Sequence, residues 1–185
     1  TLSSISILSG QVKSRLIKQP ETVEPILDKI NESAIKMNDS LQDLVWAVKP
    51  ENDTLQELLV RMEQFASGIL ESKNINYNFT GPTTVSDIKL NPELIRNIYL
   101  IFKEAVNNAA KYSNCANVTI TIKEKGKQLS LSVIDDGIGF NPETVKRGNG
   151  LNNMTKRAAQ IGGSLNIISE PNKQNGIVLE CKITS

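Results

Sequence analysis

Apolar residues in the first fifty positions recur every three or four residues, which is the period of an α-helix. Two helices are expected, one from Thr1 to about Lys18 and one from about Glu21 to Val48. The second carries a heptad-like seam made of Ile26, Ile30, Ala34, Met37, Leu41, Leu44 and Val48. Together they predict an antiparallel helical hairpin. Because one hairpin has too little apolar surface for its own core, we expect two copies to pack into a dimeric four-helix bundle; packing of the hairpin onto the rest of the chain is the alternative.

The pattern changes at Pro50–Thr54, where a proline interrupts the helical period and Thr54 can cap a new helix. Beyond it, helical stretches alternate with short runs in which every second residue is apolar. Helices are expected at 55–70, 91–112 and 151–161, and strands at 75–79, 118–122, 129–133, 165–167 and 177–183. The last two strands are expected to be joined by a polar turn through Pro171 and Gly176.

This order of elements predicts an α+β chain. Residues 1–49 form the helical hairpin, 50–54 a hinge, and 55–185 a second domain with a sheet and helices on one side of it.

Composition narrows the range of partners. The 21 basic and 20 acidic residues give a net charge of +1, which supplies no field for nucleic acid or an anionic membrane. The chain has no histidine, which excludes histidine-containing catalytic triads and the common zinc motifs. No apolar run reaches the ~18 residues of a membrane-spanning helix. Cys115 and Cys181 match no disulfide or zinc spacing, so we expect reduced, packed thiols.

The strongest candidate for a binding site is the acidic turn Asp135–Phe140, which follows the alternating run 129–133. An Asp-Gly pair after a strand is, by itself, most often a simple turn. A second glycine pair, Gly148 and Gly150, precedes the helix that begins at Leu151. Free backbone N–H groups and the positive end of the helix dipole favour phosphate at such a place.

A polar stripe lies on the expected helix 91–112. At about 100° per residue, Glu104, Asn108 and Lys111 fall within about 60° of one another, beside the buried face. Asn107 is expected to point further towards solvent, so Asn108 is the better ligand candidate. Ordinary boundary residues are the alternative interpretation of this stripe.

Three separated segments share an order and a spacing with a known family. Glu104-xxx-Asn108-xx-Lys111, Asp135-x-Gly137-x-Gly139 and Gly148-x-Gly150-Leu151 resemble the nucleotide-binding boxes of the ATPase superfamily of gyrase, Hsp90, histidine kinases and MutL. Within that superfamily, the run Leu41–Leu55 resembles the end of the hairpin and the start of the catalytic domain in sensor histidine kinases of the nitrate- and desaturase-sensor type. The resemblance covers essentially the whole chain. It implies a two-layer α/β sandwich of the Bergerat ATPase type and an ATP-dependent protein-histidine kinase of a two-component system.

The resemblance also implies roles for single residues. Asp135 would accept a hydrogen bond from the adenine amino group. Asn108 would give an amide oxygen to Mg²⁺, which prefers oxygen ligands, and Lys111 would meet phosphate charge. The box glycines would let the backbone approach the base and the phosphates, at Gly137, Gly139, Gly148 and Gly150.

Three further residues complete the predicted site. Glu104 is the catalytic candidate, polarising either the phosphoryl acceptor or the waters of the metal. Tyr112 lies along the nucleotide or is a packing residue. Leu151 belongs to the ATP-binding set at the start of its helix.

The phosphorylated histidine of this family lies on the first hairpin helix. Matching Thr1–Ile5 to that helix places it about six residues before Thr1, under two helical turns away. The chain is therefore expected to be part of a longer protein, to bind ATP, and to be unable to phosphorylate itself. The phosphoryl group would pass on to an aspartate of a response regulator receiver domain.

The resemblance also implies a location, the cytoplasmic portion of a membrane-anchored bacterial sensor, with membrane contact only through regions outside this chain. Two other functions fit part of the pattern. One is an ATPase or serine kinase of the same superfamily, of the anti-sigma-factor type. The other is a non-catalytic dimerisation module.

Overall fold

A computed structural model gives the structure of the chain and describes residues 2–15, 23–47, 54–82, 89–139, 149–169 and 175–183. The chain divides into two compact units, Thr1–Val48 and Lys49–Ser185. The predicted hinge at 50–54 lies outside the described residues, apart from Thr54.

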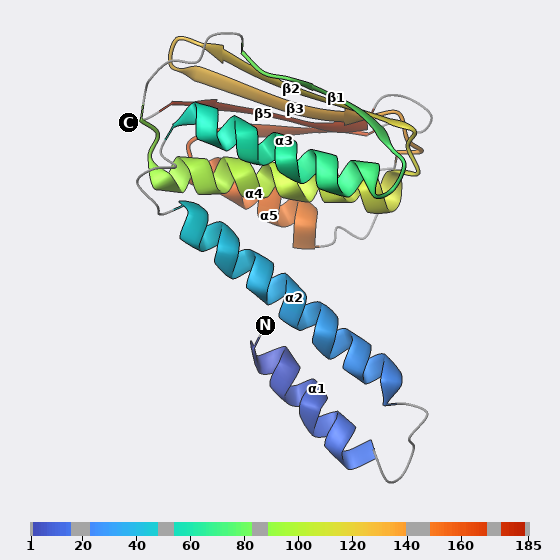
Figure 1. Cartoon of the computed structure of the whole chain (residues 1–185). Coiled ribbons are helices and arrows are strands. Elements are labelled where there is room, and N and C mark those ends of the chain that lie inside the picture. The colour runs from blue at the N-terminus through green and yellow to red at the C-terminus, as the bar shows by residue number, and fades with distance from the viewer. Residues whose placement is uncertain are drawn as a thin grey trace. The chain divides into compact units, whose positions relative to one another are not determined.

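The first unit is an antiparallel helical hairpin. α1 (Leu2–Arg15) and α2 (Glu24–Ala47) pack against each other and run in opposite directions (Figure 1). Val23 and Ile26 are buried where α2 begins, and the Val23 carbonyl accepts the Ile26 N–H at 3.0 Å. The hairpin predicted from the helical period is thus confirmed.

Only part of the predicted seam on α2 is covered within one chain. Ile26 is buried, and Ile30 and Met37 are half-buried, while Ala34 and Leu41 are exposed in the single chain. α1 has 14 residues and α2 has 24, so at about 1.5 Å per residue α1 reaches little more than halfway along α2. Leu41 lies beyond the end of α1. Ala34 lies alongside α1 and is nevertheless exposed, so the face of α2 that α1 covers is narrower than the predicted seam.

The second unit is built on a five-stranded mixed sheet with the order β1-β2-β3-β5-β4. Its strands are β1 (Asn76–Thr80), β2 (Asn117–Lys125), β3 (Gln128–Asp135), β4 (Ser164–Ile168) and β5 (Asn175–Lys182). β1 pairs with β2 in parallel, and all other neighbours are antiparallel. The predicted hairpin between β2 and β3 is confirmed, with Gly126 at φ +61° in its turn.

Helices cover one face of this sheet, as Figure 1 shows. They are α3 (Leu55–Glu71), α4 (Pro92–Asn108) and α5 (Asn149–Gln160). Phe102 of α4, Leu131 of β3 and Leu179 of β5 are fully buried between the two layers. The α+β class and the two-layer arrangement are as predicted, because the strands alternate buried residues with exposed or half-buried ones and so have one core face.

The helix ends follow from capping residues. The Thr54 hydroxyl accepts the Glu57 N–H at 3.2 Å, and the Asn91 side chain accepts the Glu93 N–H at 2.8 Å. α5 ends where Gly162 takes φ +62°, as the expected Gly162-Gly163 stop requires. These local interactions set where α3, α4 and α5 begin or end, and hence which residues reach the edge of the sheet.

Two expectations about the last strand and the thiols need correction. Gly176 is the second residue of β5 rather than part of a turn, and a Cβ there would overlap the Val133 carbonyl of β3. The turn at Pro171 lies outside the described residues.

Cys181 is a buried core thiol, and burial raises its pKa to about 11. Cys115 is also a free thiol but is only half-buried.

Candidate functional site

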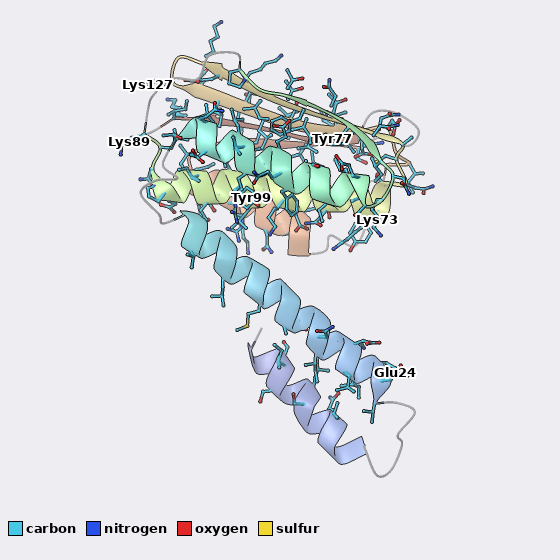
Figure 2. All side chains as sticks on the ribbon, viewed as in Figure 1. Glu24, Lys73, Tyr77, Lys89, Tyr99 and Lys127 are labelled. Atoms are coloured by element: carbon cyan, nitrogen blue, oxygen red, sulfur yellow. The ribbon has the colours of Figure 1, made fainter. Side chains whose placement is uncertain are left out.

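Asp135 is a buried carboxylate at the end of β3. Its side chain is 8% exposed, and its Oδ1 accepts the Gly137 N–H at 2.9 Å. Burial raises the pKa of this carboxyl, hydrogen bonds from Gly137 and Ser113 partly oppose the rise, and the charge of Asp136 adds to it. Lys127, labelled in Figure 2, marks the opposite end of the β2–β3 hairpin.

Asp136, its neighbour, has a different environment. It is exposed, and its Oδ1 accepts the N–H groups of Ala116 and Asn117, both at 2.9 Å, while its Oδ2 accepts the Asn117 side chain at 2.7 Å. These bonds lower the pKa of Asp136, the Asn117 side chain contributing most. Asp136 therefore ties the end of β3 to the start of β2, which leaves Asp135 as the carboxylate available to a ligand.

The turn after Asp135 is fixed from two sides. The Ile138 N–H donates to the Ser113 carbonyl at 2.8 Å, and the Asn175 side chain donates to the Gly137 carbonyl at 3.0 Å. A Cβ on Gly137 would overlap the Ser113 carbonyl and lie 2.7 Å from Asp135 Oδ1, so this position has room only for glycine. Gly139 needs glycine for another reason, since its φ is +65°.

α4 changes its geometry directly after Asn108. Residues Ala109–Ser113 form a π-helical turn, η3, and the chain then reverses at Asn114, which has φ +54°. We expected a single α-helix to Tyr112, so the angle of 100° per residue does not apply beyond Asn108. The wider turn brings the Ser113 carbonyl to the acidic turn, and such turns are frequent at functional sites.

The polar stripe of this helix is confirmed only in part. Glu104 and Asn108 are half-buried, as expected for boundary positions, but Lys111 is exposed. Asn107 is half-buried as well, so the expectation that it points further towards solvent than Asn108 stays a prediction. Tyr112 is 72% exposed and is therefore not a core packing residue.

Glu104 meets the third segment at the first turn of α5. A Cβ on Gly150 would overlap Glu104 Oε1 and lie 3.0 Å from its carboxyl carbon. Thus the carboxylate of Glu104 lies against the end of α5 where we had expected free N–H groups to face a ligand. Leu151 follows as a half-buried residue, and Gly148 lies outside the described residues.

α5 is held in place by a part-buried contact that the sequence did not reveal. Asn97 of α4 is 3% exposed, and its Oδ1 accepts Arg157 Nη1 at 3.2 Å. Burial and the charge of Arg96 lower the pKa of Arg157, and Glu104 acts in the opposite direction. Asn97 lies among the apolar residues of α4, so the hydrophobic period of that helix gives no sign of the hydrogen bond to Arg157.

The structure therefore joins the predicted segments in two contacts. Asp135 and Gly137 meet η3 at Ser113, and Gly150 meets α4 at Glu104. Both contacts involve the continuous segment formed by α4 and η3. The sequence pattern gives no sign of Ser113, Asn117 or Asn175, because each is a polar residue at the end of an element and nothing separates it from a turn residue.

A sequence profile of the histidine kinase-, DNA gyrase B- and HSP90-like ATPases matches residues 93–185. The matched range contains both contacts, from Glu104 to Gly150. The chain belongs to this ATPase family. The resemblance to the ATPase superfamily of gyrase, Hsp90, histidine kinases and MutL is thereby confirmed, whereas the narrower likeness to nitrate and desaturase sensors stays a prediction.

Two curated relatives of this chain are named as sensor kinases. The sensor histidine kinase LiaS of Bacillus subtilis (strain 168) is 35% identical over 100 residues, which are 54% of this chain and 27% of LiaS. An uncharacterized sensor-like histidine kinase of Chloroflexus aurantiacus is 24% identical over 191 aligned positions, covering 100% of this chain and 32% of that protein. The chain thus spans about a third or less of the curated relatives it matches.

Solved structures share the fold. The histidine kinase AdeS of Acinetobacter baumannii aligns with a TM-score of 0.67 at 15% identity, over 98% of this chain and 96% of that one. Full-length ShkA, solved in complex with AMPPNP, aligns with a TM-score of 0.65 at 18% identity, over 91% of this chain and 40% of that one.

Across the described helices of this ATPase-family chain, none is long and apolar enough to cross a membrane.

Proposed function

We propose that this chain is the nucleotide-binding part of a protein-histidine kinase of a two-component system. The observation that carries the proposal is the buried Asp135 carboxylate, held at the end of β3 by the Gly137 N–H and packed against η3 of the ATPase-family segment. The sensor kinases among its relatives support the choice of histidine kinase within that family.

Asp135 would recognise adenine. A carboxylate accepts hydrogen bonds only, so an ionised Asp135 favours a base that offers an amino group over one that offers a carbonyl. Its Oδ1 already accepts the Gly137 N–H at 2.9 Å, which fixes the direction of the carboxylate. In a buried place such a contact is selective, because a base without a donor leaves the carboxylate unpaired.

The α4–η3 segment would hold the phosphates. Asn108 is half-buried and Lys111 exposed, which suits an amide ligand for Mg²⁺ and a cation that meets phosphate from solvent. The described part of the chain has no group of three His, Cys, Asp or Glu side chains that could hold a metal ion. We therefore expect Mg²⁺ to arrive with the nucleotide, where it would neutralise phosphate charge.

Glu104 and Tyr112 would complete the site. The Glu104 carboxylate lies against Gly150, at the start of α5, which supports a role near the transferred phosphate. The 72% exposure of Tyr112 leaves its ring free to lie along a nucleotide. Gly139 and Leu151 would shape the backbone around the ligand, together with Gly148.

The phosphoryl acceptor would be a histidine outside these 185 residues, since the chain contains none. We propose that the phosphoryl group then passes to an aspartate of a response regulator, and that the hairpin forms a homodimer. Exposed apolar residues on the hairpin support the dimer, because large apolar side chains in water favour a partner surface. They are Ile7, Leu27, Leu41 and Val45.

Isothermal titration with a non-hydrolysable ATP analogue and Mg²⁺ tests the nucleotide site. The wild type should bind, Asp135→Asn should lose most of the affinity, and Asp136→Asn should retain it while being less stable. The two substitutions are chemically identical and adjacent, so they separate ligand recognition from folding. Absence of binding to the wild type would falsify the proposal.

Radiolabelled ATP tests the kinase assignment in the intact protein. A phosphoryl group stable to base and labile to acid is expected there, and none is expected on the 185-residue chain alone. Label on serine in the intact protein would point instead to a serine kinase of the same superfamily.

A further inference from the structure

Asn175 is a buried amide directly across the sheet from Asp135. It is the first residue of β5 and the register partner of Asp135 in the antiparallel β3–β5 pair. Its side chain is only 3% exposed, although asparagine is seldom buried. Burying an amide is costly unless it is hydrogen-bonded, so its partners indicate why it lies there.

The Asn175 side chain fixes the peptide that follows Gly137. Its Nδ2 donates to the Gly137 carbonyl at 3.0 Å, in a buried bond, and its Oδ1 accepts the Ser169 hydroxyl at 3.2 Å. The N–H of that same peptide, on Ile138, donates to the Ser113 carbonyl at 2.8 Å. The peptide is therefore held from β5 on one side and from η3 on the other.

This fixed peptide is joined through the Gly137 α-carbon to the peptide that carries the Gly137 N–H. That N–H donates to Asp135 Oδ1 at 2.9 Å and so sets the rotation of the carboxylate. Gly137 is closely packed on the side where a Cβ would stand, because that Cβ would lie 2.6 Å from Ser113 Cβ and 2.7 Å from Asp135 Oδ1. Asn175 thus acts on the Asp135 carboxylate through Gly137.

We propose that Asn175 is a positioning residue that determines how strongly the site prefers a 6-aminopurine over a 6-oxopurine. The inference rests on the proposed function, since it needs Asp135 to bind the base. Without the Asn175 amide, the Gly137 peptide gains freedom and the Asp135 carboxylate loses its fixed direction. The phosphate contacts on α4 and η3 are untouched, so only the base preference should change.

The test compares adenosine diphosphate with inosine diphosphate by isothermal titration in Mg²⁺, on the whole 185-residue chain. The wild type should prefer adenosine diphosphate by at least about tenfold, the factor expected for one hydrogen bond to a charged group. Asn175→Leu, which keeps the branched shape of the side chain and removes the amide, should reduce that preference to less than about threefold. The smaller Asn175→Ser should do the same if the leucine variant does not fold.

Asn97→Leu is the matched control. Asn97 is also 3% exposed, and its Nδ2 also donates to a carbonyl at 3.0 Å, that of Glu93, but it lies on α4 away from the acidic turn. This variant should lose a similar amount of stability and keep the full preference for adenosine diphosphate.

Each outcome decides between the two proposals. A wild type that binds neither nucleotide overturns the proposed function and this inference with it. A wild type that prefers adenosine diphosphate leaves the proposed function standing, and the inference is then overturned if the Asn175 variants keep the preference or if Asn97→Leu loses it too. Failure of both Asn175 variants to fold would mark Asn175 as a folding residue and also overturn it.

Discussion

Replacing Gly137 with alanine tests whether η3 and the acidic turn are in contact. The added Cβ would lie 2.6 Å from Ser113 Cβ and 2.7 Å from Asp135 Oδ1, and it would overlap the Ser113 carbonyl. The φ of Gly137 is not positive, so alanine is excluded by space and not by backbone conformation. The turn and η3 would have to separate by roughly 1 Å to reach ordinary contact distances.

The cost of that separation follows from two terms. Overpacking a tight site costs about 1–3 kcal/mol. Loss of the hydrogen bond from the Ile138 N–H to the Ser113 carbonyl adds about 0.5–1.5 kcal/mol. We expect Gly137→Ala to lower the free energy of unfolding by about 2–4 kcal/mol, a large share of the 5–15 kcal/mol typical of a domain.

Urea denaturation followed by circular dichroism measures this loss. Gly68→Ala is the control, because Gly68 lies exposed within α3 with no atom near an added Cβ, and alanine there should stabilise by up to about 1 kcal/mol. Gly137→Ala should also lose nucleotide binding at temperatures where it is folded. If its unfolding free energy stays within about 0.5 kcal/mol of wild type, the contact between η3 and the turn is wrong.

Further predictions concern the other parts of the second unit. Gly150→Ala should lower the free energy of unfolding by about 1 kcal/mol or less, since the Glu104 carboxylate can move aside. In a protein that already carries Glu104→Ala, the same change should have no measurable effect. Urea denaturation measures both, and an equal loss with and without Glu104→Ala would refute the contact. Thr54→Ala should lower the free energy of unfolding by about 1 kcal/mol, seen in thermal melts, because the helix cap is lost, whereas Thr54→Ser keeps a hydroxyl and should not. Equal melting temperatures of the wild type and both variants would count against the cap. Because burial raises the pKa of Asp135, its contribution to stability is present below the unfolded value of 3.8 and is lost as pH rises through the folded value. Asp135→Asn should therefore melt higher than wild type at pH 7 and lose that advantage on acidification; a lower melting temperature at pH 7 would contradict this.

Much of the fold could be predicted because each element carries its own local pattern. Asn91-Pro92 indicates the start of α4, and the alternation on either side of Gly126 indicates the β2–β3 hairpin. The helical period defined α1 and α2 for the same reason. Local pattern also selected the three segments of the site, since glycines and carboxylates at the ends of elements are unusual combinations.

The rest of the site depends on contacts between distant segments. The hydrophobic period of α4 gives no indication that the helix widens after Asn108. The π turn is stabilised by contacts with the acidic turn, including the hydrogen bond from the Ile138 N–H to the Ser113 carbonyl. Asn175 belongs to a strand, yet beside Gly176 it resembles a turn residue. Its burial follows only from the pairing of β5 with β3.

The most direct test of the central claim, that three distant segments form one nucleotide site, is chemical-shift mapping by NMR during titration with adenosine diphosphate and Mg²⁺. The account predicts the largest shifts at Glu104–Ser113, Asp135–Gly139 and Asn149–Leu151. Shifts confined to one of these segments, or centred elsewhere in the chain, would contradict it.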